Sequence, residues 1–299
     1  MKTSISGIFL SLIVGILIGI SGSQNSMQLF DVPLFALCGL LIFAFQWLAF
    51  VPAYWFQTES FFDLMGSVTY VTVIIVVCFT PGIHFVNAVF LGVLVAIWAV
   101  RLGAFLFTRL HRKGFDSRFI DIKPDPLRFF MVWTLQGLWI FVTFAAGLAA
   151  MTSNRALVYT PVTIAGAVIW VWGFVMEVIA DLQKKAFRSD TQGQGLFITS
   201  GLWSFSRHPN YVGEITLWFG IALIAVPVLR EWQFVTMVSP IFVWILLRWI
   251  SGVPMLEAQA DQNWGENPEY RQYMESTPVL FPNPYRMVKA LFSEFSRER

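Results

Sequence analysis

The sequence is poor in charge, in cysteine and in histidine, and each shortage excludes a class of protein. Charged residues make up 13% of the 299 positions, about half of the roughly 25% found in soluble globular domains. The two cysteines, Cys38 and Cys78, lie in apolar stretches, which is typical of small buried side chains and not of a disulfide framework. The three histidines lie far apart, so we expect no metal site. The net charge of +2 gives no reason to expect a nucleic-acid partner.

Long apolar runs are what the sequence does contain. Hydrophobic residues make up 57% of the chain, and the mean hydropathy is +0.66. A helix that spans a bilayer needs roughly 20 mostly apolar residues, and eight windows meet this need. We therefore predict an all-α fold, a polytopic transmembrane bundle of about eight spans that contacts membrane lipids. For the first window, a cleaved signal peptide is the alternative to a span. The windows are 4–22, 30–50, 62–80, 84–107, 128–151, 157–180, 211–230 and 233–250.

The distribution of lysine and arginine predicts the orientation of these spans. Basic residues gather between the fourth and fifth spans, between the sixth and seventh, and after residue 250, whereas the alternating loops carry only Arg155 and Arg230. Eight spans with both termini and all the basic loops in the cytoplasm satisfy this pattern. We treat residues 1–299 as a single membrane domain, with residues 1–100 facing a lipophilic small-molecule substrate and residues 101–299 forming a cofactor-binding part.

The densest polar stretch is Gly201–Glu214, which lies between two apolar segments. Ionisable groups at a membrane boundary are costly and usually mark a functional site. Pro209 suits the first turn of a helix, and the free N–H groups at a helix start favour an anion. An interfacial loop with an ordinary aromatic belt is the alternative. The candidate cofactor contacts in this stretch are Trp203 and Tyr211 (stacking), Arg207 (an anion clamp), Asn210 and Glu214 (hydrogen bonds to a ribose or an adenine), and His208, which belongs to the same motif.

Two further groups flank this stretch. Asp181, Lys185 and Arg188 follow the sixth apolar window with spacings of three and four, which place them on one helical face with Glu177. A helix that leaves the membrane with snorkelling lysines is the alternative. Beyond the last window, Glu257, Asp261 and Tyr270 are candidate contacts, and an amphipathic helix on the membrane surface is the alternative.

A smaller group lies near the N-terminus. Glu59 and Asp63 stand at the start of the third apolar window, and Tyr70 lies further along it. An acid or a tyrosine in such a place could donate a proton to a substrate, so these three residues are the catalytic candidates. For Asp63, an ordinary helix N-terminal acid stabilised by the dipole is the alternative.

These motifs resemble the membrane reductase superfamily of steroid 5α-reductases and sterol reductases, and most closely a bacterial branch with the steroid 5α-reductase C-terminal domain. The likeness covers roughly residues 95–285. The motifs that carry it are Arg101-Leu-Gly, Gly114-Phe-Asp-Ser-Arg-Phe119, Glu177-x3-Asp181-x-Gln-Lys184, Gly201-Leu-Trp-Ser-Phe-Ser-Arg-His-Pro-Asn-Tyr-Val-Gly-Glu214, Ser251-Gly-Val-Pro-Met-Leu-Glu257 and Pro268-x-Tyr270-x2-Tyr273.

The resemblance implies NADPH bound on the cytoplasmic side of the bacterial inner membrane, and hydride transfer to a C=C bond of a steroid-like or other lipid enone. It implies that Asp181, Arg188, Asn210 and Glu214 contact the cofactor. The Arg-His-Pro-x-Tyr core is similar to that of isoprenylcysteine carboxyl methyltransferases, so a methyltransferase that uses S-adenosylmethionine is the alternative. A lipid-binding scaffold or transporter is the non-enzyme alternative.

Overall fold

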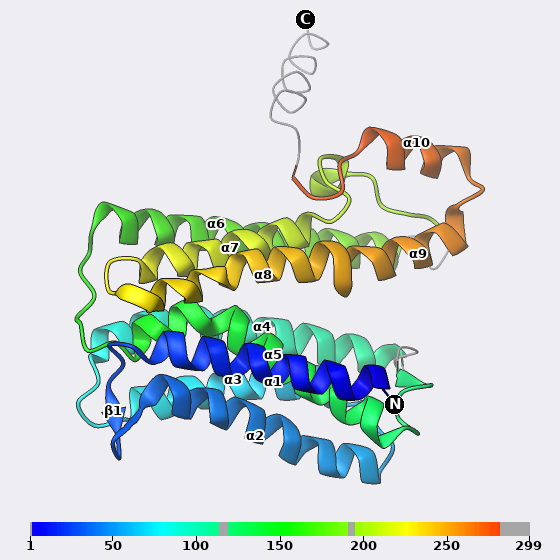
Figure 1. Ribbon diagram of the computed structural model, residues 1–299. Coiled ribbons are helices and arrows are strands. Elements are labelled where there is room, and N and C mark those ends of the chain that lie inside the picture. The colour runs from blue at the N-terminus through cyan, green and yellow to red at the C-terminus, as the bar shows by residue number, and fades with distance from the viewer. Residues whose placement is uncertain (1, 114–118, 191–194, 282–299) are drawn as a thin grey trace, which may run out of the picture. The chain divides into compact units, whose positions relative to one another are not determined.

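The computed structural model describes residues 2–113, 119–190 and 195–281, and helices dominate these ranges (Figure 1). Short 3-10 segments occur at Gly201–Ser204 (η2) and Glu231–Val238 (η3), a π-helical turn at Leu246–Ile250 (η4), and a hairpin at Gln28–Leu29 (β1) and Val32–Pro33 (β2). The α-helices are α1 (Lys2–Ser23), α2 (Leu34–Trp55), α3 (Phe62–Cys78), α4 (Phe85–Lys113), α5 (Pro126–Met151), α6 (Pro161–Asp190), α7 (Pro209–Ala225), α8 (Ser239–Ile245), α9 (Val253–Trp264) and α10 (Pro268–Ser276).

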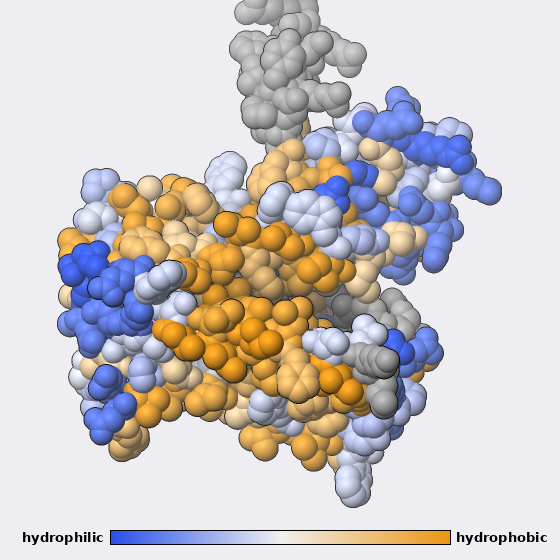
Figure 2. All heavy atoms as spheres, in the orientation of Figure 1, coloured by the Kyte–Doolittle hydropathy of each residue, from blue (hydrophilic) through white to orange (hydrophobic). Residues whose placement is uncertain are grey.

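The apolar helices confirm the expected polytopic helical bundle. Among the described residues, six helical segments are long and apolar enough to cross a membrane, and α3 is a shorter apolar helix. Each of the eight predicted windows coincides with a helical segment. Large apolar side chains such as Phe9, Leu40 and Trp172 are exposed on these helices, and Figure 2 shows hydrophilic residues gathered over α10. Exposed apolar faces of this extent suit lipid and not water, so the chain is an integral membrane protein.

The described residues pack as two compact units. Unit 1 comprises residues 1–166 and 221–239, and unit 2 comprises residues 167–220 and 240–299. All candidate cofactor contacts belong to unit 2, and the three catalytic candidates belong to unit 1. The predicted division near residue 100 was a division by function, which packing does not test, so it stays a prediction.

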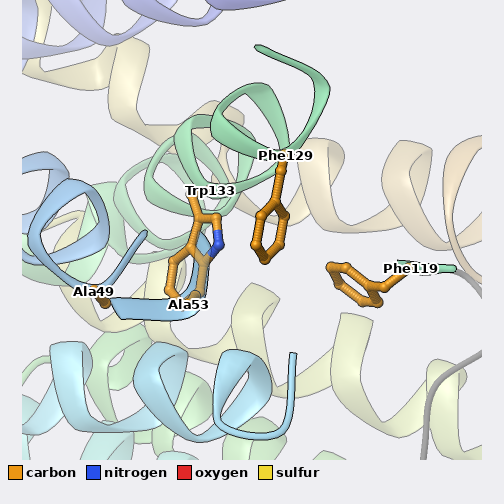
Figure 3. Close-up of a cluster of buried hydrophobic side chains, with 5 residues drawn as sticks. All are labelled: Ala49, Ala53, Phe119, Phe129 and Trp133. Atoms are coloured by element: carbon orange, nitrogen blue, oxygen red, sulfur yellow. The ribbon is translucent and has the colours of Figure 1, made fainter. Parts of the chain in front are cut away.

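Unit 1 is built around α5, against which α1, α2, α3 and α4 pack. The most apolar window of α5 is 72% buried, the largest share among the candidate spans. Close approach is allowed where a glycine faces a large ring: a Cβ on Gly39 of α2 would lie 2.7 Å from the ring of Phe141 of α5. At one end of the unit, Ala49, Ala53, Phe119, Phe129 and Trp133 form a buried apolar cluster (Figure 3). The short segment before α5 therefore closes this end of the bundle with an aromatic side chain.

Candidate functional site

The site in unit 2 depends on an unusually close crossing of α6 and α7. A Cβ on Gly213 would lie 2.6 Å from the backbone nitrogen of Glu177, and a Cβ on Gly173 would lie 2.5 Å from that of Leu217. Real side chains do not tolerate such distances to backbone atoms, so only glycine allows the two backbones to meet. The glycine in the Asn-Tyr-Val-Gly-Glu sequence is thus explained by helix packing, and this packing fixes the side chains around it.

Next to this crossing, acids and amides gather between the two helices. Asn210 donates from Nδ2 to Oδ1 of Asp181, 3.3 Å away. Glu177 and Glu214 are 2% and 9% exposed, and Asp181 is 7% exposed. Carboxylates buried near apolar surface are costly without polar partners. The structure therefore joins two predicted cofactor contacts, Asp181 and Asn210, by a hydrogen bond, and a third, Glu214, is buried one helical turn beyond Asn210 on α7.

The loop that leads into α7 is held against α6 by its own side chains. Gly201 has a φ of +62°, a conformation that favours glycine, and Gln183 Oε1 accepts a hydrogen bond from the backbone N–H of Leu202. Trp203 is buried and donates from Nε1 to the carbonyl of Ala180. The ammonium of Lys184 lies 4.4 Å from the centroid of the Trp203 ring, a cation–π contact. The Trp203 ring thus anchors the loop to α6.

Arg207 and His208 share one carboxylate oxygen. Oε1 of Glu257 lies 3.1 Å from Nη1 of Arg207 and 3.2 Å from Nε2 of His208. Because a carboxylate oxygen only accepts, the imidazole must donate from Nε2. The Tyr211 ring stacks on the His208 ring, with centroids 5.5 Å apart and an interplanar angle of 13°. Predicted contacts from just before α7 and from α9 thus meet at one carboxylate oxygen, although His208 and Glu257 are 49 residues apart.

Burial sets the charge state of the histidine. His208 is 5% exposed, and its burial lowers the pKa of the imidazole. The hydrogen bond to Glu257 opposes this, while the positive charges of Lys184 and Arg207 lower the pKa of His208 further. The neutral form is therefore favoured. Among the described residues, neither Nδ1 of His208 nor Nε of Arg207 has a hydrogen-bond partner, although both atoms are buried.

A second cluster ties α9 to α10. The hydroxyl of Tyr270 donates to Oδ1 of Asp261 over 2.9 Å, and that of Tyr273 donates to the carbonyl of Trp203 over 2.7 Å. Desolvation raises the pKa of both tyrosines, so both remain protonated donors. Phe197 packs against both tyrosine rings. Two candidate cofactor contacts, Asp261 and Tyr270, are thus joined by a hydrogen bond that the sequence analysis did not predict, and Tyr273 fixes α10 to the loop before α7.

A hollow of about 370 Å³ adjoins this cluster and is lined by Arg207 and residues 274–279. Arg207 also contacts the sulfur of Met274 through Nη1, 2.9 Å away. Lys185 and Arg188 lie on exposed positions of α6. Met274 escaped the sequence analysis, since its residue type by itself does not suggest chemistry, and Gln183 was quoted there only as part of a motif and without a role. Gly173 escaped it as well, although its spacing from Glu177 and its small size were the available signal.

The three catalytic candidates lie in unit 1, and the structure gives them different surroundings. Glu59 is 6% exposed and forms an ion pair with Lys123. Asp63 is in the first turn of α3. Tyr70 is 1% exposed and is surrounded by the rings of Trp98, Trp139 and Phe144. Their catalytic role stays a prediction.

Comparison with known proteins places the chain in a family. A segment of 111 residues is 30% identical to "Probable O-methyltransferase ustE" of Ustilaginoidea virens. The matched segment covers 37% of this chain and 34% of that protein. The chain thus matches only about a third of that relative's length. No solved structure matches the chain. The family described as "Protein of unknown function (DUF1295)" matches residues 49–277, well over half of the sequence, and the chain therefore belongs to the DUF1295 family.

Proposed function

We propose that this protein is a membrane-embedded, NADPH-dependent reductase of a C=C bond in a steroid-like or other lipid enone. The observation that carries the proposal is the hydrogen bond between Asp181 of α6 and Asn210 of α7, with the buried carboxylates of Glu177 and Glu214 on the same two helices. Carboxylates accept hydrogen bonds from ribose hydroxyls, and NADPH keeps both hydroxyls of its nicotinamide ribose, although its adenosine 2′-hydroxyl is a phosphate. The DUF1295 family is associated with steroid 5α-reductase-like membrane proteins, which supports the same function.

The cations of unit 2 fit the rest of such a cofactor. Arg207 lines the hollow beside α10, and Lys185 and Arg188 are exposed on α6. Guanidinium and ammonium groups bind phosphate oxygens, and NADPH has three phosphates. When bound, NADPH would supply a hydride to one carbon of the enone. The other carbon would take a proton, for which Glu59, Asp63 and Tyr70 are the candidates.

An S-adenosylmethionine-dependent methyltransferase is the second candidate. The relative named as a probable O-methyltransferase favours it. A buried acidic cluster would also accept from the ribose of S-adenosylmethionine, so the cluster alone serves both cofactors. The phosphates distinguish them, since S-adenosylmethionine has none and needs no cationic groups for them.

The full chain purified in detergent tests this choice. We expect NADPH to raise its Tm and to bind in a saturable titration, while S-adenosylmethionine does neither. Asp181→Asn together with Asn210→Ala should weaken NADPH binding, whereas Glu266→Gln, a change at an exposed acid of the same unit, should leave it unchanged. Stabilisation by S-adenosylmethionine alone would favour the methyltransferase. Binding of neither cofactor would favour the lipid-binding scaffold or transporter.

A location in the bacterial inner membrane, with the cofactor site on the cytoplasmic side, is part of the proposal. Its support is the concentration of basic residues in alternate loops of the sequence. Cysteine labelling from either side of the membrane, with single cysteines at exposed Lys185 and exposed Arg155, checks it. We expect an impermeant reagent in intact cells to label position 155 and not position 185.

A further inference from the structure

The most informative feature of unit 2 is a pair of consecutive side chains that each present an unused polar atom. Nε of Arg207 can only donate a hydrogen bond, and it is buried without a partner in the described part of the chain. Nδ1 of His208 is buried without a partner there as well. Buried polar atoms are normally satisfied, and the exceptions call for an explanation such as a ligand.

The hydrogen bond to Glu257 decides what His208 offers. Because Nε2 must donate to the carboxylate, the neutral ring carries no proton on Nδ1, which is then an acceptor. The tautomer is thereby set by Glu257 and not by the ligand. The two consecutive residues therefore present one donor, Arg207 Nε–H, and one acceptor, His208 Nδ1.

Both side chains are held in place before any ligand binds. The same oxygen of Glu257 contacts Arg207 and His208. The Tyr211 ring stacks on the imidazole, and the position of a Cβ on Gly252 would lie 3.0 Å from Cε2 of Tyr211. The backbone at Gly252 thus supports the tyrosine, and the tyrosine supports the histidine. Such preorganisation lowers the cost of ordering side chains on binding.

We propose that Arg207 Nε and His208 Nδ1 together bind a primary carboxamide, and that Glu257 is a positioning residue that does not itself contact the ligand. A carboxamide has an oxygen that accepts and an NH₂ group that donates, which are the two complements of the donor and the acceptor that the pair leaves unused. This inference rests on the proposed function: in NADPH the group is the carboxamide of the nicotinamide ring. It changes the expected role of Glu257 from a cofactor contact to the residue that fixes the other two. It also changes that of Arg207 from a phosphate contact to a carboxamide donor, which leaves Lys185 and Arg188 for the phosphates.

Three ligands separate the inference from the proposed function. NADP⁺ has the carboxamide. Its 3-acetylpyridine analogue has a methyl ketone instead, which accepts but cannot donate. Adenosine 2′,5′-bisphosphate lacks the nicotinamide part entirely and reports on the remainder of the site. Their Kd values are measured by titration on the full chain in detergent.

We expect the wild type to bind NADP⁺ about tenfold more tightly than the acetylpyridine analogue, since one hydrogen bond to a buried acceptor is lost. His208→Phe keeps an aromatic ring for Tyr211 to stack on but has no acceptor. It should lower the affinity for NADP⁺ to that for the analogue, while binding of the bisphosphate stays unchanged. Unchanged bisphosphate binding also shows that the variant is folded.

Glu257 is tested with two variants, one that keeps a hydrogen-bond acceptor and one that removes it. Glu257→Gln retains a carbonyl oxygen that can accept from Nε2, so it should keep the preference for NADP⁺. Glu257→Leu should lose it. A His208→Phe variant that keeps the full preference would overturn the carboxamide assignment, and a Glu257→Leu variant that keeps it would overturn the positioning role. If the wild type binds neither NADP⁺ nor the bisphosphate, the proposed function itself fails.

Discussion

The polar groups of the two units are arranged in different ways. In unit 2, one oxygen of Glu257 contacts both Arg207 and His208, and each of these residues keeps a buried nitrogen without a partner in the described structure. In unit 1, Glu59 is paired with Lys123 at the end closed by the aromatic cluster around Trp133. A carboxylate whose two partners each keep an unused buried nitrogen suits ligand binding. An ion pair at the closed end of a helical bundle suits stability. We therefore expect substitutions to change binding in unit 2 and stability in unit 1.

The largest effect should come from the helix crossing that supports the site. Gly213→Ala puts a Cβ 2.6 Å from backbone atoms of α6, and overpacking of this kind costs roughly 1–3 kcal/mol, or more where backbone has to move. We expect a clear fall in Tm and a loss of NADPH binding. Gly19→Ala is the control in unit 1, because nothing lies within 4 Å of its added Cβ. That change should stabilise α1 slightly, by about 0.5–1 kcal/mol. Equal Tm values for the two variants would contradict the role of the crossing.

The crossing also shows what the sequence could and could not predict. The eight apolar windows were enough to predict the helices, since length and hydropathy determine what can span a bilayer. The crowding of Arg207, His208 and Asn210 within four positions predicts a site, and the cofactor contacts assigned to it stay a prediction. The partners of these residues were not predictable in detail, because Glu257 and Asp181 reach them through tertiary packing. Which of several acids would meet Arg207 depends on how α9 returns to α7, and local spacing does not determine that path.

The next largest effect concerns the ion pair in unit 1. Lys123→Met removes the cation of this pair from the buried Glu59 carboxylate, and losing one partner of a fully buried pair costs about 3–5 kcal/mol. The Lys123 side chain is 21% exposed, so solvent reduces the cost, and we expect roughly 1–3 kcal/mol. Adding Glu59→Gln should recover part of the loss, because the double variant has no unpaired charge. Thermal unfolding of the four proteins of the cycle measures the coupling.

The same variants distinguish a structural from a catalytic Glu59. If Glu59 mainly stabilises unit 1, Glu59→Gln should lower Tm and leave NADPH binding unchanged. Under the proposed function, reductase activity at a temperature where the variant is folded should also persist. A folded Glu59→Gln protein that binds NADPH but has no activity would instead support the proton-donor role predicted for this residue.

A smaller effect should appear as a dependence on pH. Burial lowers the pKa of His208 in the folded protein, so the unfolded chain binds a proton more readily. The free energy of unfolding therefore rises with pH between the lowered pKa of the folded state and the unfolded pKa of about 6.5. The contribution of neutral His208 is complete above the unfolded pKa and is lost as the pH falls below it. We expect the Tm of the wild type to fall between pH 7.5 and pH 5.5 more steeply than that of His208→Phe. Parallel curves for the two proteins would contradict a neutral, buried His208.

The smallest effect should come from a single hydrogen bond away from the carboxylate of Glu257 that Arg207 and His208 share. Tyr270 is 4% exposed and donates to Asp261, and the Asp261 carboxylate adds to burial in raising the pKa of the phenol. Tyr270→Phe should cost about 1 kcal/mol, seen as a small fall in Tm. Tyr159→Phe, at a tyrosine of unit 1 that is 62% exposed, should change the Tm almost not at all.

The binding of NADPH to the Tyr270→Phe variant decides what the hydroxyl does. If the variant also weakens NADPH binding without a matching loss of stability, the hydroxyl contacts the cofactor, as its place among the predicted contacts implied. If only stability changes, the Tyr270 hydroxyl holds α10 to α9 and is not part of the ligand-binding surface of unit 2.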